Sequence, residues 1–513
     1  MLALLCLMTI TPAGPLTGSP TDSPTDSPAA ATAAERPNVL MIVVDDMRVE
    51  LGCYGQSHVI SPNIDALAAR GTRLDRAYCQ QAVCNPSRAS VLTGLRPDTL
   101  GVFDLETHFR DRRPDVVTLP QAFKHAGYRT RGLGKVFHNW HQPSRRGDAR
   151  SWTEPAMLHY GNHGDDVPHV GVIPPNEADT PKLYRHDVPD EAYFDGRIAR
   201  IAAEAIEGYA ADQADDPEAA PFFLAVGFWK PHSPFNAPAK YWQLYDDTAA
   251  SDPVPAAAPS DVPKLALHDS REIRRAFKSR PGRRPDATDT RALRTGYYAA
   301  ISFVDAQIGR VLEALNRSGL DDNTIVVFWS DHGYHLGEHT LWAKTSNFEL
   351  DARVPLIIAR PGQQPAATDA IVELVDLYPT LADLCGVTPP KNLEGVSLRP
   401  VLEDAAARVK DAAITWHPRP AYVTPEQPPE AMGWSIRVDQ ARYTEWRDFE
   451  TDDLLAAELY DHRTDPLETA NLAGNSVRAD QVAELAAELA EHRQRAGAEA
   501  GSKPKSKAGS RTR

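Results

Sequence analysis

The sequence predicts an α/β fold, with a mostly parallel sheet flanked by helices and a smaller C-terminal α+β subdomain. Three continuous apolar runs carry this prediction, at residues 39–44, 222–226 and 324–329. Such runs are typical of parallel strands covered on both faces, and strands that alternate with helical patterns indicate one α/β sheet. From about residue 386 the pattern changes to Pro-rich turns, a β-like stretch and a terminal helix, which predicts the separate subdomain.

Five segments are expected along the 513 residues. Leu2 to Ile10 is an apolar run too short to span a bilayer but suited to a secretory signal, although basic residues before it are absent. The repeated Ser, Pro, Thr and Asp that follow are typical of a disordered tether. The segments are a signal peptide (1–18), a disordered linker (19–36), the main α/β domain (37–385), the C-terminal subdomain (386–497) and a disordered basic tail (498–513). We therefore expect an exported protein, periplasmic or extracellular, with no membrane span.

Charge and cysteine content narrow the class of protein. The formal net charge of -15 argues against general nucleic-acid binding, which needs a basic surface. The 5 cysteines show no paired spacing, so we expect no structural disulfide and no zinc knuckle.

The first apolar strand ends in Asp45-Asp46, and a helix should follow it. Ser61 is the expected N-cap of this helix, Pro62 lies in its first turn and Gly71 closes it. The second strand ends near Lys230 and His232, and the third ends near Asp331 and His332. Ligands of open α/β sheets bind beyond the carboxyl ends of the strands, so these polar ends predict one shared site.

Apolar residues recur with only weak periodicity in residues 140–200 and 235–290. This pattern indicates two long excursions, that is, loops that extend from the core. Long excursions near a site often form the walls of a substrate pocket.

Residues 84–96 form the most informative segment of the chain. They read Cys-Asn-Pro-Ser-Arg-Ala-Ser-Val-Leu-Thr-Gly-Leu-Arg. Pro86 suits a first helical turn and Gly94 a helix end, so Cys84 should lie at a helix N-terminus, where a sulfate or phosphate is favoured. The alternative is an ordinary cysteine in a turn. The segment resembles the signature that sulfatases present for conversion of cysteine to Cα-formylglycine, whose hydrated aldehyde would be the nucleophile.

Asp45, Asp46, Asp331 and His332 are the candidate metal ligands. With the modified side chain of Cys84 and a substrate oxygen, they would complete a six-fold, oxygen-rich shell suited to one calcium ion, and magnesium is the alternative. Taken alone, an Asp pair at a strand end is more often an ion-paired turn.

Four further side chains are candidates for binding the anion or moving a proton. Lys135 and Lys344 would stabilise negative charge in a water-poor pocket, and His138 and His232 would handle protons near neutral pH. Taken singly, each would be a surface charge or a structural histidine. Arg88, one helical turn after Cys84, would hold the hydrated aldehyde.

Most of residues 37–475 resembles the type I, formylglycine-dependent sulfatases, and within them the group of iduronate-2-sulfatase and its bacterial relatives. The resemblance is carried by residues 44–48, 80–84, 134–138, 230–232, 331–333, 342–344, 375–380, 458–461 and 465–466. It implies the alkaline-phosphatase-like fold, calcium, a formylglycine derived from Cys84, and a formylglycine-generating enzyme as the partner during maturation. It also implies hydrolysis of a sulfate ester on a sulfated saccharide through a covalent sulfo-formylglycine intermediate. The site residues that it implies are Asp45, Asp46, Cys84, Arg88, Lys135, His138, His232, Asp331, His332 and Lys344.

The chain departs from this group where the sugar would lie. Trp229 stands before Lys230 where His is expected, and Tyr334-His335 replaces a Trp-Ala pair. Trp229 could offer a flat face to a pyranose and His335 could donate to a sugar oxygen, and the alternative is that these side chains only pack loops. Two rival functions stay open: hydrolysis of a phosphomonoester, phosphodiester or phosphonate on the same fold, and an inert carbohydrate-binding relative.

Overall fold

A computed structural model of the chain describes residues 36–138, 147–157, 183–246, 250, 252–274 and 283–499. The expected signal peptide, nearly all of the expected linker and almost the whole basic tail lie outside these residues. Within them, no helix is long and apolar enough to cross a membrane.

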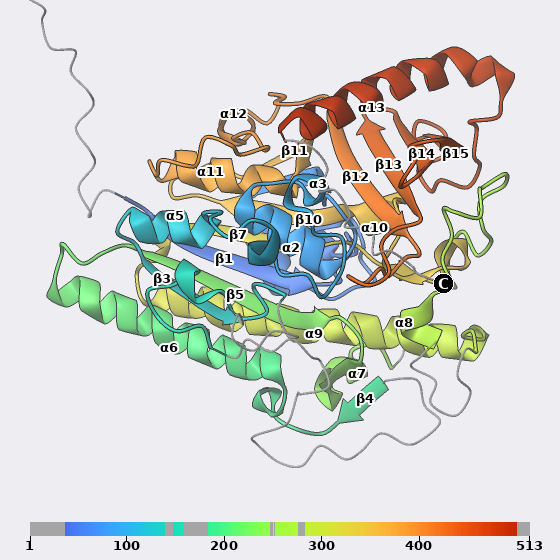
Figure 1. The fold of residues 1–513 in the computed structure, drawn as a ribbon. Helices are drawn as coiled ribbons and strands as arrows, with labels where there is room; N and C mark the ends of the chain where they lie inside the picture. Colours follow the sequence, from blue (N-terminus) through green and yellow to red (C-terminus); the bar gives the residue numbers. More distant parts are fainter. Residues whose placement is uncertain are drawn as a thin grey trace, which may run out of the picture.

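A seven-stranded mixed sheet forms the centre of the main domain (Figure 1). Most neighbouring strands are parallel, and β10 is antiparallel to both of its neighbours. In spatial order the strands are β11 (Ala366–Glu373), β2 (Thr72–Tyr78), β10 (Arg353–Ala359), β7 (Thr324–Ser330), β1 (Asn38–Asp45), β5 (Phe222–Pro231) and β3 (Arg129–Gly134). The three apolar runs are β1, β5 and β7, which pair side by side, so this part of the prediction is confirmed.

Strand β1 shows why the apolar runs do not alternate with polar residues. Leu40, Ile42 and Val44 pack into the core on one face of the sheet, whereas Met41 and Val43 pack into the core on the other face. All eight residues of β1 are buried. Since side chains point alternately to the two faces of a strand, a strand covered on both faces is apolar throughout.

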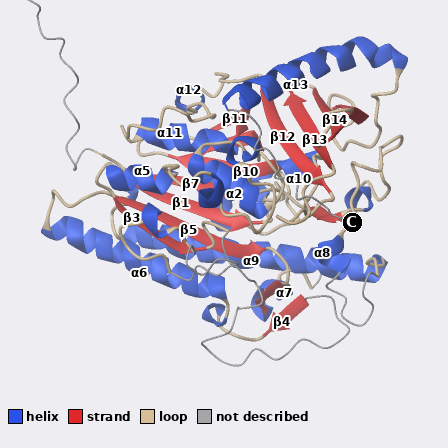
Figure 2. Cartoon of the chain, in the orientation of Figure 1, coloured by secondary structure: helices blue, strands red, loops and turns tan. Residues whose placement is uncertain are grey.

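Helices cover both faces of this sheet, as Figure 2 shows. One face carries α1 (Pro62–Ala68), α6 (Phe194–Asp215) and α9 (Ala287–Arg317), and the other carries α2 (Cys84–Thr93), α5 (Leu119–His125), α11 (Leu377–Leu384) and α12 (Arg399–Glu403). Helix α1 follows Ser61 as predicted, but the Ser61 hydroxyl does not cap it and instead accepts from the N–H of Gly52 and donates to Asp65.

Short elements fill the loops around these layers. They are α3 (Pro97–Leu100), α4 (Phe109–Arg112), α7 (Ala239–Gln243), α8 (Arg271–Arg274) and α10 (Glu349–Ala352), the parallel pair β4 (Leu183–His186) and β6 (Phe235–Pro238), and the antiparallel pair β8 (His335–Leu336) and β9 (Trp342–Ala343).

The C-terminal part of the chain forms a separate antiparallel sheet. Its strands are β12 (Ala412–Arg419), β13 (Ala431–Val438), β14 (Ala441–Asp448) and β15 (Leu454–Asp461), and α13 (Ala479–Glu499) packs Leu485 and Leu489 against it. This confirms the smaller α+β subdomain, while the exact domain boundaries stay predictions. The subdomain joins the main domain through β12, where the Trp416 N–H donates to Gln80 O at 3.0 Å and the Thr415 hydroxyl donates to Cys79 O at 2.9 Å.

Candidate active site

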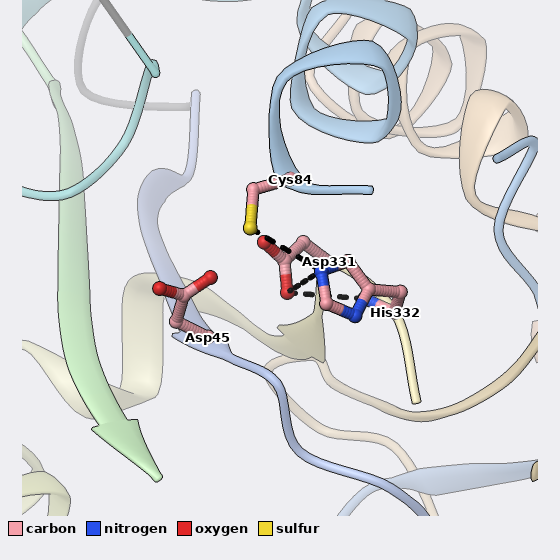
Figure 3. Close-up of side chains that lie close together, drawn as sticks. All are labelled: Asp45, Cys84, Asp331 and His332. Carbon is pink, nitrogen blue, oxygen red and sulfur yellow. Dashed lines mark hydrogen bonds and ion pairs between the residues drawn. The ribbon is translucent and has the colours of Figure 1, made fainter. Parts of the chain in front are cut away.

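The site lies at the carboxyl edge of the main sheet, where several strands deliver polar side chains. Asp45 is the last residue of β1, and Asp331 follows β7 directly. Figure 3 shows their carboxylates together with Cys84 and His332. All four side chains are buried. The structure therefore brings together these predicted residues, which are far apart in the sequence.

Cys84 is the first residue of α2, and Gly94 ends this helix in a left-handed conformation with φ 70°, as predicted. The Cys84 Sγ lies 3.3 Å from His332 Nε2, and only 2% of the residue is exposed. Burial raises the pKa of the Cys84 thiol well above its usual value, and the Asp45 carboxylate adds to the effect. A thiol in this place is therefore a poor nucleophile, because the thiolate is the reactive form.

Arg88 lies one turn further along α2, is fully buried, and fixes two of the carboxylates. Its Nε donates to Asp331 Oδ2 at 2.8 Å, and its Nη2 lies 3.3 Å from Asp45 Oδ1 and 3.2 Å from Val44 O. A further bond runs to Lys135 O. Arg88 thus orients the strand ends, and the predicted contact with a modified Cys84 stays a prediction.

The donor set suits a divalent cation. One ligand atom each from Asp45, Cys84, Asp331 and His332 can lie within 4.8 Å of one another. Asp46, with φ 66°, turns the chain so that its N–H donates to Asp331 Oδ1 at 3.1 Å and its carboxylate lies 3.3 Å from His332 Nε2. Burial raises the pKa of Asp46 well above its usual value; Lys344 opposes this rise, and the Asp45 and Asp331 carboxylates add to it. A cation at this point would offset the gathered negative charge, so the residues fit a metal ion.

His332 is held in the form that binds metals. Its Nδ1 lies 2.9 Å from Gly333 O, which assigns the proton to Nδ1 and leaves Nε2 facing Cys84 and Asp46. Burial lowers the pKa of His332. A neutral imidazole is the form that acts as a metal ligand.

Lys135 enters the site through a close approach of two strands. Gly134 (φ 69°) ends β3, and a Cβ on Gly227 of β5 would lie 2.1 Å from Lys135 O, so only glycine fits there. The Lys135 Nζ pairs with Asp45 and lies 5.6 Å from the centre of the Trp229 ring. Burial acts to lower the pKa of Lys135, but Asp45 and Cys84 outweigh it, and the pKa is raised. Lys135 is therefore a fixed cation.

Lys344, the residue after β9, approaches the carboxylate of Asp46, whereas Lys135 approaches that of Asp45. Its Nζ lies 2.9 Å from Asp46 Oδ2, 2.8 Å from Glu272 Oε2 and 3.0 Å from His232 Nε2. Burial acts to lower the pKa of Lys344, but Asp46 and Glu272 outweigh it and raise the pKa well above its usual value. The site thus holds two buried ammonium groups beside the candidate nucleophile.

His232 lies in the site. His138 lies close in the chain to Lys135, another residue of the site. The Nδ1 of His232 lies 2.5 Å from Ser233 O, which leaves its Nε2 facing Lys344 and Asp46. His138 is buried three residues after Lys135. Its predicted role in proton transfer stays a prediction.

Comparisons with known proteins decide the family. A family model described as Sulfatase matches residues 37–387, and a second model, described as N-sulphoglucosamine sulphohydrolase, C-terminal, matches residues 337–495. The chain belongs to the sulfatase family. The iduronate 2-sulfatase of Mus musculus is 34% identical to it over 87% of this chain and 92% of that protein. The predicted enzyme class, a sulfuric ester hydrolase, is thereby confirmed.

Solved structures of other proteins have the same fold as this sulfatase. A structure in complex with its substrate D-glucosamine-2-N,6-O-disulfate has a TM-score of 0.68 and 24% identity, and the match covers 90% of this chain and 98% of that one. The phosphonate monoester hydrolase of Silicibacter pomeroyi has a TM-score of 0.72 and 26% identity, over 90% of this chain and 96% of that one. These likenesses confirm the predicted alkaline-phosphatase-like fold.

The residues predicted to contact the sugar are all buried in this sulfatase. Trp229 stacks on Phe194 with ring centres 5.5 Å apart, and Tyr334 stacks on Tyr297 at 5.5 Å. His335 has Nδ1 2.7 Å from an Asp351 oxygen and Nε2 3.2 Å from His339 Nδ1. Both ring nitrogens of His335 are therefore engaged. These contacts favour the packing alternative, and a role in sugar binding stays a prediction.

Two residues of the site escaped the sequence analysis. Glu272 of α8 contacts Lys344, and the Tyr422 hydroxyl donates to Glu272 Oε2 at 3.1 Å. Tyr422 follows β12 of the C-terminal subdomain. The only signal in the sequence was that Glu272 falls within the excursion at residues 235–290, because no local motif marks either side chain.

Proposed function

We propose that this sulfatase hydrolyses a sulfate ester on a sulfated saccharide, with a formylglycine derived from Cys84 as the nucleophile. The observation that carries the proposal is the buried Cys84 at the start of α2, with His332 at 3.3 Å and a thiol pKa raised by burial. A buried thiol with a raised pKa holds little of the reactive thiolate, whereas a hydroxyl of the hydrated aldehyde can attack sulfur as its proton passes to a base in the site.

The two buried lysines support the binding of a sulfate ester. Lys135 and Lys344 approach Asp45 and Asp46 respectively, so an anion held beside Cys84 meets fixed ammonium groups. Preorganised charges in a water-poor site stabilise the negative charge that grows on the outer oxygens of the ester during transfer. His232, whose Nε2 faces these groups, and His138 are the candidates for proton transfer at the departing sugar oxygen.

One calcium ion is the metal that we propose for the site. Asp45, Asp46, Asp331 and His332 would hold it, together with the modified side chain of Cys84. The ion would polarise a sulfate oxygen and offset the charge of the three carboxylates. The gathering of carboxylates supports this, because Asp45 and Asp331 add to the rise that burial causes in the pKa of Asp46.

The relatives favour a saccharide substrate. The mouse relative is named iduronate 2-sulfatase, and a fold neighbour is described with a disulfated glucosamine as its substrate. A uronate 2-O-sulfate is accordingly the first candidate. Export, a cleaved signal peptide at residues 1–18, and maturation by a formylglycine-generating enzyme belong to the same proposal.

Two measurements test it. Mass spectrometry of the peptide around Cys84 from active protein should show the aldehyde or its hydrate, and an unmodified thiol in active enzyme would contradict the formylglycine. A panel of defined sulfated mono- and disaccharides, assayed beside a phosphate monoester, should give the highest kcat/KM with a sulfated sugar. A clear preference for the phosphate ester would instead favour the phosphoester hydrolase.

A further inference from the structure

Lys344 is shared between two carboxylates that belong to different parts of the site. Asp46, at 2.9 Å, belongs to the candidate metal ligands, whereas Glu272, at 2.8 Å, comes from the short helix α8. No strand of the main sheet carries Glu272, and the proposed function gives it no task. In the proposed function the ammonium group of Lys344 binds the anionic ester. The carboxylate of Glu272 reduces the positive charge that the ester meets there, so its presence needs a physical explanation.

Glu272 is held by several contacts and is therefore a fixed charge. Ser233 Oγ donates to its Oε1 at 3.1 Å, and the Tyr422 hydroxyl donates to its Oε2 at 3.1 Å. The guanidinium of Arg271 lies 4.9 Å from the centre of the Tyr422 ring. Three separate segments of the chain thus converge on this carboxylate.

The carboxylate is ionised at neutral pH. Burial acts to raise the pKa of Glu272, but the ammonium of Lys344 and hydrogen bonds from Tyr422 and Ser233 outweigh it, and the pKa is lowered. Its Oε1 also lies 3.9 Å from His232 Nε2. One full negative charge therefore stands next to the groups that would hold the ester.

We propose that Glu272 makes the pocket selective for charge, so that it favours a monoanionic sulfate monoester over a dianionic phosphate monoester. The proposal rests on the proposed function, in which Lys344 binds the ester. Both esters are tetrahedral, but a sulfate monoester carries one negative charge, whereas a phosphate monoester carries close to two above its second pKa of about 6. Glu272 offsets one unit of charge on Lys344, and its repulsion acts about twice as strongly on a dianion as on a monoanion.

The test measures binding in the full chain with Cys84→Ala, supplied with calcium, so that no turnover occurs. Titration calorimetry at pH 8 gives the Kd of methyl sulfate and of methyl phosphate, first with Glu272 intact and then with Glu272→Gln. We expect the Kd ratio of phosphate to sulfate to fall about tenfold in Glu272→Gln, because the loss of one buried charge favours the dianion more. Glu272→Asp and Tyr422→Phe are matched controls that keep the charge, and we expect them to leave the ratio unchanged.

The ratio separates selectivity from a structural role. If Glu272→Gln weakens or strengthens both ligands by the same factor, Glu272 only positions Lys344 and the proposal is overturned. A second measurement changes the charge of the ligand: between pH 8 and pH 5 methyl phosphate becomes a monoanion, so its affinity should rise relative to that of methyl sulfate, and this rise should be larger with Glu272 intact than in Glu272→Gln. An equal rise in both proteins would overturn the proposal. Failure of the proposed function would appear elsewhere, as absence of sulfate-ester turnover in the enzyme with Cys84 intact.

Discussion

Replacing Lys344 by Met removes one ammonium group and keeps most of the side-chain volume. In the folded protein this leaves the carboxylates of Asp46 and Glu272, 2.9 and 2.8 Å away, without their shared cation. Only 2% of the Lys344 side chain is exposed, so water cannot replace the lost charge. Removal of one partner of a buried ion pair costs about 3–5 kcal/mol of unfolding free energy. Loss of one charged donor to the reacting group should lower kcat about 10²–10³-fold.

The assay must separate the loss of chemistry from the loss of stability. Lys410 is a matched control, because its Nζ also bridges two carboxylates, Glu373 and Asp376, each at 2.7 Å, and it lies outside the site. We expect Lys344→Met and Lys410→Met to lower the urea midpoint to a similar degree, and only Lys344→Met to lower kcat per folded molecule. A Lys344→Met enzyme that keeps kcat within about threefold of the parent would refute the role given to Lys344.

Three further outcomes are expected. Cys84→Ala should abolish sulfate-ester turnover and leave circular dichroism and the urea midpoint nearly unchanged, because it removes a nucleophile and little packing; residual turnover above background would contradict this. Asp46→Asn should weaken calcium binding measured by calorimetry while the protein stays folded, since an oxygen remains and a charge is lost; an unaltered affinity would place the ion elsewhere. Burial raises the pKa of Glu458 to about 7, so the stability that its proton provides is complete below about pH 4.5 and is lost as pH rises through 7. Between pH 4.5 and 8, the unfolding free energy from urea titrations should therefore change by about 3 kcal/mol less in Glu458→Gln than in the parent. If the unfolding free energies of the two proteins change with pH in the same way, the assignment is wrong.

The features that depend on local sequence could be predicted. The unbroken apolar run of β1 follows from burial on both faces, and the helix from Cys84 to Gly94 follows from a proline in its first turn and a glycine at its end. The shared site also followed, because β1 and β7 end at the same edge of the sheet. In these cases each residue's neighbours in the chain, or the general geometry of parallel sheets, determine where it lies.

The features that depend on contacts between distant segments could not be predicted. Glu272 and Tyr422 meet at 3.1 Å although 150 positions separate them, and neither belongs to a motif. The sequence also did not show that β10 would enter the sheet antiparallel, since an apolar strand reads the same in both directions. The contacts of His335 with Asp351 and His339 could not be predicted either, because they are set by the packing of the loop after β7.

The bonds from β12 to Cys79 and Gln80 bear on the order of events in biosynthesis. The segment just before Cys84 is completed by a strand made more than three hundred residues later, and Cys84 itself is then only 2% exposed. A modifying enzyme needs access to the side chain and to the backbone around it. The conversion proposed for Cys84 therefore has to happen while the C-terminal sheet is still unfolded or not yet synthesised, so that slower folding of β12 would lengthen the time available for it.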